Sequence, residues 1–101
     1  MTTTYHYLHD RQEREKLIQQ IGYGKVVKSV VIDRGHKKGA EIHQLSDTGI
    51  ITIYNQFTHK LITKLIANPH QVRRYYTENE TPPKNIVKLA YEHTQKGYNY
   101  C

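Results

Sequence analysis

The chain has 101 residues, of which 37% are hydrophobic and 24% charged, and its formal net charge is +6. This length predicts one domain, residues 1–101, and no apolar run approaches the roughly 18 residues of a membrane-spanning helix. The start lacks the basic and apolar regions of a signal peptide, and Cys101 has no second cysteine to pair with, so we expect a cytosolic protein.

Residues 10–21 predict the first helix. Asp10 is a capping residue, and Glu13 three positions later completes a capping box. The apolar residues Leu17, Ile18 and Ile21 recur at helical spacing. Gly22 then stands where a helix commonly ends.

Residues 26–67 predict a sheet of four strands. β-Branched and alternating segments cover residues 26–33, 41–46, 50–55 and 60–67, separated by residues typical of turns. The short connections make the strands antiparallel. The last segment, KLITKLIA, is almost continuously apolar, which predicts a place near the centre of the sheet.

Residues 69–97 predict the C-terminal helical part. Asn68 before Pro69 begins a short helix that continues to Tyr76, and Thr81 with Pro82 begins a longer one that ends at Gly97. The fold class is therefore α+β: an N-terminal helix, a four-stranded antiparallel meander, and one short and one longer C-terminal helix. Helices cover one face of the sheet, and the other face stays partly open.

The positive charge favours an acidic partner, most commonly nucleic acid. The chain has nine tyrosines and no tryptophan, and several tyrosines stand beside Arg or Lys. Exposed tyrosine rings stack on bases, although a tyrosine at the edge of a core is the simpler alternative. The residues predicted to bind nucleic acid are Arg34, Lys37, Lys38, Lys64, Arg73, Arg74 and Tyr75.

The stretch RGHKKGAEIHQ, residues 34–44, combines two histidines with a glutamate and several cations. Cleavage of RNA without a metal needs a base for the 2′-hydroxyl, an acid for the leaving oxygen, and cations near the phosphate. The candidate catalytic residues are His36, His43, Glu41, Lys60 and Thr63. The alternative is that His36 is a surface loop residue and His43 pairs with a polar neighbour across the strand.

No cofactor and no metal is expected. The chain has no Walker A loop and no dinucleotide-binding or nucleophile-elbow motif. His6, His9 and Asp10 are the best set of zinc ligands, but no cysteine pair supports them.

A helix followed by an antiparallel meander with basic and histidine residues resembles the barnase, EndoU, colicin and RelE-like group of small ribonucleases. The stretch NQFTHKLITKLIA, residues 55–67, is similar to a hairpin of prophage and toxin members of that group. The resemblance covers about residues 8–76. It implies His36 or His43 as acid or base, Lys60 near the phosphate, and Thr58 or Thr63 as a hydrogen-bonding partner. The whole chain also resembles small proteins of Gram-positive prophages and conjugative elements.

Three functions stay open at this point. The first is an RNA-directed protein of a mobile element, with metal-independent endoribonuclease activity as its enzymatic form. The second is a non-enzymatic inhibitor, similar to an anti-CRISPR protein, that binds a host nucleic-acid-binding effector protein. The third is a nucleic-acid-binding accessory protein. The sequence leaves the oligomeric state open.

Overall fold

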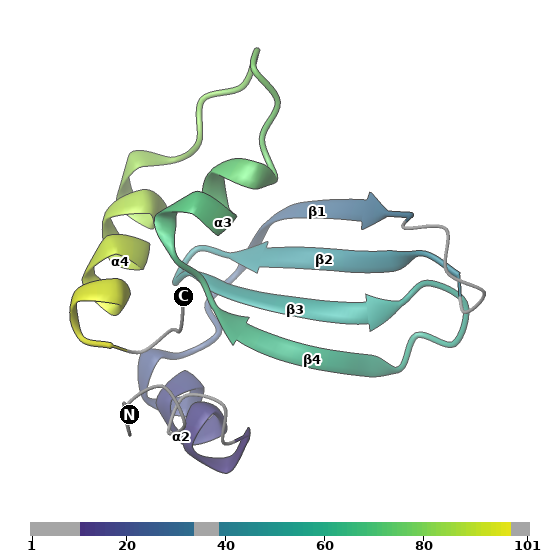
Figure 1. Cartoon of the computed structure of the whole chain (residues 1–101), viewed down its shortest axis with the longest axis horizontal. Coiled ribbons are helices and arrows are strands. Elements are labelled where there is room, and N and C mark those ends of the chain that lie inside the picture. Colours follow the sequence, from purple (N-terminus) through teal and green to yellow (C-terminus); the bar gives the residue numbers. More distant parts are fainter. Residues whose placement is uncertain (1–10, 34–38, 98–101) are drawn as a thin grey trace, which may run out of the picture.

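A computed structural model describes residues 11–33 and 39–97 and confirms the predicted α+β fold (Figure 1). Its elements follow in the expected order, from one helix through four strands to two helices. They are α2 (Arg11–Ile21), β1 (Val26–Ile32), β2 (Glu41–Ser46), β3 (Ile50–Asn55), β4 (Leu61–Ile66), α3 (Pro69–Arg74) and α4 (Lys84–Gln95). Among these residues, no helix is long and apolar enough to cross a membrane.

The four strands form one antiparallel sheet in the order β1-β2-β3-β4. The prediction that residues 60–67 lie near the centre of the sheet is therefore wrong, because β4 is an edge strand of the described sheet. Its apolar character has a different cause. Leu65 packs against the core on one side of the sheet, Ile66 packs against α2 on the other, and Leu61 and Ile62 stay exposed.

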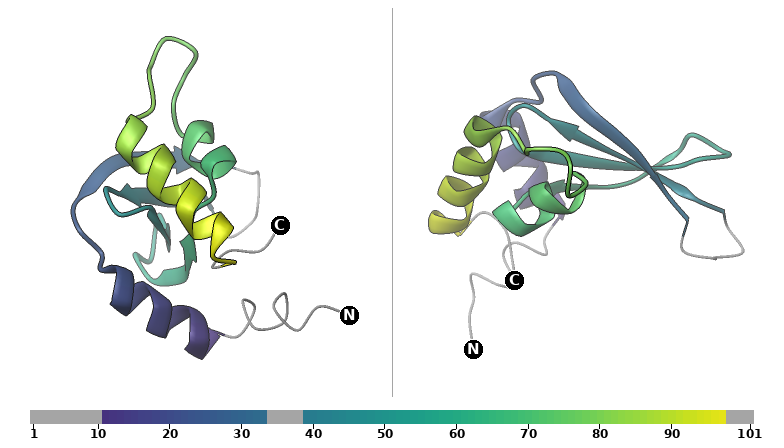
Figure 2. Two further views of the ribbon diagram at one scale, coloured as in Figure 1. Left: turned by 90° about the vertical axis from the view of Figure 1, so that its left-hand side faces the viewer. Right: turned by 90° about the horizontal axis from the view of Figure 1, so that it is seen from above.

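Two separate apolar cores lie on opposite faces of the sheet. Ile50 and Ile51 are adjacent in β3, so their side chains point to opposite faces. Ile51 belongs to the larger core beneath α3 and α4, together with buried residues such as Ile86. Ile50 belongs to the smaller core beneath α2, with Ile18. We call the first the α3–α4 face and the second the α2 face; Figure 2 shows the helices from two further sides.

The α2 face is covered only in part. A row of directly opposed residues crosses all four strands on this face, namely Val31, Ile42, Tyr54 and Leu61. The two ends of the row are exposed, Val31 to 55% and Leu61 to 47%. The prediction that the helices cover only one face is therefore wrong, because α2 packs on the face opposite to α3 and α4. The expected partly open face is the one that α2 covers incompletely.

The observed helix boundaries agree with the predicted ones at the start of α3 and differ from them at its end and at the start of α4. α3 begins as predicted, because the Asn68 side chain accepts from the Gln71 N–H while the Gln71 side chain accepts from the Asn68 N–H. It ends at Arg74, two residues earlier than expected. α4 begins at Lys84 without a side-chain cap, after the expected start at Thr81 and Pro82. The predicted cap at Asp10 lies outside the described residues.

Candidate nucleic-acid interface

Four of the predicted site residues lie outside the described part of the chain. They are His36 of the predicted catalytic set and Arg34, Lys37 and Lys38 of the predicted nucleic-acid-binding set. The same holds for His6, His9 and Asp10. The structure places all the other predicted site residues.

The sheet brings His43 together with Glu41 and Tyr75. His43 lies on the α3–α4 face of β2 and is 3% exposed. Its Nε2 is 3.0 Å from Glu41 Oε1, and its Nδ1 is 2.7 Å from the Tyr75 hydroxyl oxygen. An ionised carboxylate only accepts, so in the neutral ring Nε2–H donates to Glu41 and Nδ1 accepts from the Tyr75 hydroxyl. We call these three residues the His43 network.

The His43 network fixes the short helix α3 to the sheet. Tyr75 follows the last residue of α3, and its ring lies 5.6 Å from the His43 ring, centroid to centroid. Both ring nitrogens of His43 are engaged within the protein, so neither is open to a phosphate or a 2′-hydroxyl. This geometry favours the alternative stated for His43 from the sequence, a histidine paired with polar neighbours.

Lys60 is not brought to His43. Its carbonyl accepts from the Asn55 N–H at 2.9 Å, and Asn55 in turn opposes Glu41 in the register. Lys60 therefore lies two strands away from β2, which is roughly 10 Å at the usual strand spacing. Its side chain is exposed at the turn that leads into β4.

Thr63 and Lys64 face α2. Arg14 Nη2 donates to Thr63 Oγ1 at 3.2 Å, and Lys64 Nζ donates to Glu15 Oε1 at 3.0 Å. The Tyr23 side chain and the Glu15 carboxylate favour the charged form of Lys64 and raise its pKa above the ordinary value. Lys64 is thus an ion-pair partner of α2, which reduces its availability for a nucleic-acid phosphate.

A second ion pair joins β1 to the connection between α3 and α4. Lys28 Nζ lies 2.8 Å from Glu80 Oε2, and the same ammonium lies 5.1 Å from the centroid of the Tyr76 ring. The hydrogen bond from Lys28, followed by that from the Thr77 N–H, lowers the pKa of Glu80. Burial raises the pKa of Tyr76. These contacts hold the residues that follow α3 in place.

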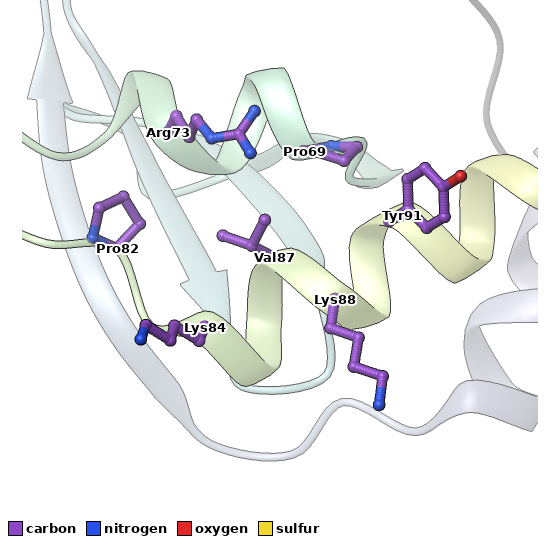
Figure 3. Close-up of a pocket in the computed structure, with 7 residues that line it drawn as sticks. All are labelled: Pro69, Arg73, Pro82, Lys84, Val87, Lys88 and Tyr91. Atoms are coloured by element: carbon purple, nitrogen blue, oxygen red, sulfur yellow. The ribbon is translucent and has the colours of Figure 1, made fainter.

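A concave surface with a consistent charge lies between α3 and α4, and we call it the α3–α4 groove. Its volume is about 600 Å³. Three cations, one exposed tyrosine and an apolar floor make up its lining, which contains no carboxylate (Figure 3). The lining residues are Pro69, Arg73, Pro82, Lys84, Val87, Lys88 and Tyr91.

The side chains of the groove are arranged by the two helices. Figure 3 shows Val87 pointing from α4 toward α3, with Arg73 of α3 above it. Lys84 and Lys88 extend outward from α4, while Arg73 belongs to α3, so both helices contribute cations to the lining. Tyr91 is 56% exposed, and its ring is therefore accessible for stacking. Arg74, the other predicted arginine, is also exposed but does not line the groove.

Sequence reasoning found Arg73 but missed Lys84, Lys88 and Tyr91. A signal for them exists, because these three residues stand at positions i, i+4 and i+7 of one helix. They therefore share one face of α4, while Ile86 and Ala90 on the opposite face are buried. The two faces differ in polarity as expected for a helix packed against a sheet.

Comparisons with known proteins add no family to this description. Neither a family model, nor a curated protein, nor a solved structure matches the chain. Within residues 11–33 and 39–97, no three histidine, cysteine or acidic side chains gather in a way that would hold a metal ion.

Proposed function

We propose that the protein binds single-stranded nucleic acid in the α3–α4 groove. The observation that carries this proposal is the lining itself: Arg73, Lys84 and Lys88 surround an apolar floor beside the exposed ring of Tyr91. Proteins that bind single strands combine cations that follow the phosphates with aromatic rings on which bases stack. The groove supplies both, and its lining includes no carboxylate that would repel phosphate.

The charge of the whole chain supports the same ligand. The formal net charge is +6, so the approach of a polyanion is favoured before any specific contact forms. Two other described cations are less available, because Lys28 pairs with Glu80 and Lys64 pairs with Glu15. The groove cations, in contrast, form no ion pair with another described side chain.

The endoribonuclease expectation receives less support than binding. Both nitrogens of His43 are occupied by Glu41 and Tyr75, and Lys60 lies two strands away. The enzymatic reading therefore depends on His36, which lies outside the described residues. RNA incubated with the protein in EDTA should stay intact. A 2′,3′-cyclic phosphate end that disappears in His36→Ala would establish cleavage instead.

Titration of a labelled single-stranded oligonucleotide at several salt concentrations tests the proposal. Each phosphate contact contributes about 0.7 to the slope of log K against log salt for a single strand. Arg73→Ala, Lys84→Ala and Lys88→Ala should therefore each weaken binding and reduce that slope. Lys16→Ala removes the same charge from α2, where the side chain is 69% exposed, and should leave the slope nearly unchanged.

Tyr91 separates stacking from charge. Tyr91→Ala should weaken binding by about 1–3 kcal/mol, the usual value for one stacked base, without changing the salt slope. Tyr91→Phe keeps the ring and should bind like the original protein. If Lys16→Ala weakens binding as much as the groove variants do, then the affinity comes from net charge, and the groove is not the site. If polyglutamate binds as tightly as the oligonucleotide, then an acidic protein face is the better ligand class.

A further inference from the structure

The two edges of the sheet differ in how they are covered. On the β4 side, α2 lies along the strand, and Arg11 Nη2 donates to the carbonyl oxygen of Ile62 at 3.4 Å. On the β1 side, no helix of the described chain lies along the strand, and the right-hand view of Figure 2 looks onto this edge. β1 therefore presents backbone N–H and C=O groups to solvent, and such an edge can pair with a further strand.

The side chains of β1 do little to discourage such pairing. The strand is seven residues long and reads VVKSVVI, with one charged residue and no proline. That residue, Lys28, is paired with Glu80 of the same chain. Val26, Val27 and Val31 are exposed to 55%, 44% and 55%. The one irregularity is a bulge between Val26 and Lys28, which leaves the rest of the strand regular.

We propose that β1 pairs in an antiparallel manner with β1 of a second copy, so that the two sheets join into one. The sequence of β1 allows it to pair with an identical strand. When the two-fold axis passes near Ser29, Val27 of one copy lies opposite Val31 of the other, and Lys28 lies opposite Val30. The two lysines therefore do not oppose each other, and like charges directly opposite would be destabilising.

Because α2 covers the β4 edge, the assembly should stop at two copies. A sheet with two open edges adds strands without limit, whereas a sheet with one open edge pairs once through a symmetric contact. α2 occupies the other side, which disfavours a growing fibre, and the register in which the two lysines avoid each other favours a second copy. The exposed valines lose their contact with water in the same step.

The geometry places both α3–α4 grooves on one side of the joined sheet. A two-fold axis that relates adjacent antiparallel strands is perpendicular to the sheet, so corresponding faces point the same way. If the grooves bind nucleic acid as proposed above, one strand long enough to reach both is held by two sites, which raises its overall affinity. The pairing itself does not depend on that function.

Analytical ultracentrifugation of the nucleic-acid-free protein over a range of concentrations tests the pairing. We expect a reversible equilibrium between monomer and dimer. Val31→Lys should weaken the dimer by at least about tenfold, because symmetry introduces the charge twice into the pairing strand. Leu61→Lys is the matched control, since Leu61 is the exposed residue at the other end of the same row and should leave the dimer unchanged.

Hydrogen exchange on the unsubstituted protein provides a second measurement that does not depend on the variants folding. The amides of β1 should exchange more slowly as concentration rises, while those of β4 should not change. A monomer at every concentration overturns the proposal. Equal weakening by Val31→Lys and Leu61→Lys shows contact through the open α2 face and also overturns it, as does growth beyond a dimer.

Discussion

Removal of one hydroxyl group should reveal whether the His43 network holds the fold together. Tyr75→Phe keeps the ring, which packs against the larger core, and deletes the oxygen that lies 2.7 Å from His43 Nδ1. His43 is 3% exposed, so water has little access to replace that oxygen. A buried polar group that loses its partner costs about 1–3 kcal/mol. The total stability of a small domain is about 5–15 kcal/mol, so the loss should be easy to detect.

Denaturant melts followed by circular dichroism measure this loss, and a double-mutant cycle assigns it to the pair. His43→Leu leaves the Tyr75 hydroxyl and the Glu41 carboxylate without their shared partner, so it should also destabilise the protein. The double variant should lose less than the sum of the two single losses, because replacing both members of a hydrogen bond removes the unsatisfied group.

Tyr91→Phe serves as the control for the loss of a tyrosine hydroxyl. Tyr91 is exposed, so its substitution should change the free energy of unfolding by no more than about 0.5 kcal/mol. The reasoning fails if Tyr75→Phe costs no more than this control, or if the two single losses simply add. In either case, the contacts of His43 would be incidental, and its imidazole would again be a candidate for proton transfer.

Two further predictions concern packing and charge. Ile51→Ala should cost about 2–5 kcal/mol, because Ile51 is fully buried in the larger core. Leu61→Ala at the exposed end of β4 should cost no more than about 0.5 kcal/mol. Equal losses in a denaturant melt would contradict the placement of Ile51 in the core and of Leu61 outside it. Lys28 lowers the pKa of Glu80. The Lys28–Glu80 contact should therefore stabilise the fold fully at pH values above the ordinary glutamate pKa of 4.5. This stabilisation should be lost as the pH falls through the lowered pKa of Glu80. Lys28→Met should raise the midpoint of the Glu80 carboxyl titration in NMR, and an unchanged midpoint would mean that the ion pair does not form in solution.

The sequence predicted the elements well because their signals are local. Asn68 followed by Pro69 predicted the start of α3, and alternation in residues 41–46 predicted β2. Which of the two faces is buried depends on how the helices dock, and that information is distributed over the whole chain. The same limit explains the error about β4, because an apolar strand at an edge covered by a helix has the same composition as a central one.

The candidate site could be predicted only in part for a related reason. His43 was a candidate because histidine can transfer protons at neutral pH. In the structure it is buried and bonded to Glu41 and Tyr75, so it helps to hold α3 on the sheet. The groove residues Lys84 and Lys88 are ordinary surface lysines until α3 is placed beside α4. Their helical spacing was readable from the sequence, but the arginine opposite them comes from another helix, and no local pattern connects the two.

The His43 network and the α3–α4 groove are physically linked through α3. This helix has six residues, too few to be stable alone in water, so its position depends on its contacts. It is held at its start by the Asn68 cap, at its middle by the buried Val72, and just beyond its end by the bond from Tyr75 to His43. Arg73 lies between the last two of these anchors and lines the groove. The buried histidine is therefore part of the support that keeps one wall of the groove in place. If the groove binds nucleic acid as proposed, a loss of that support should lower the affinity without removing any residue that lines the groove.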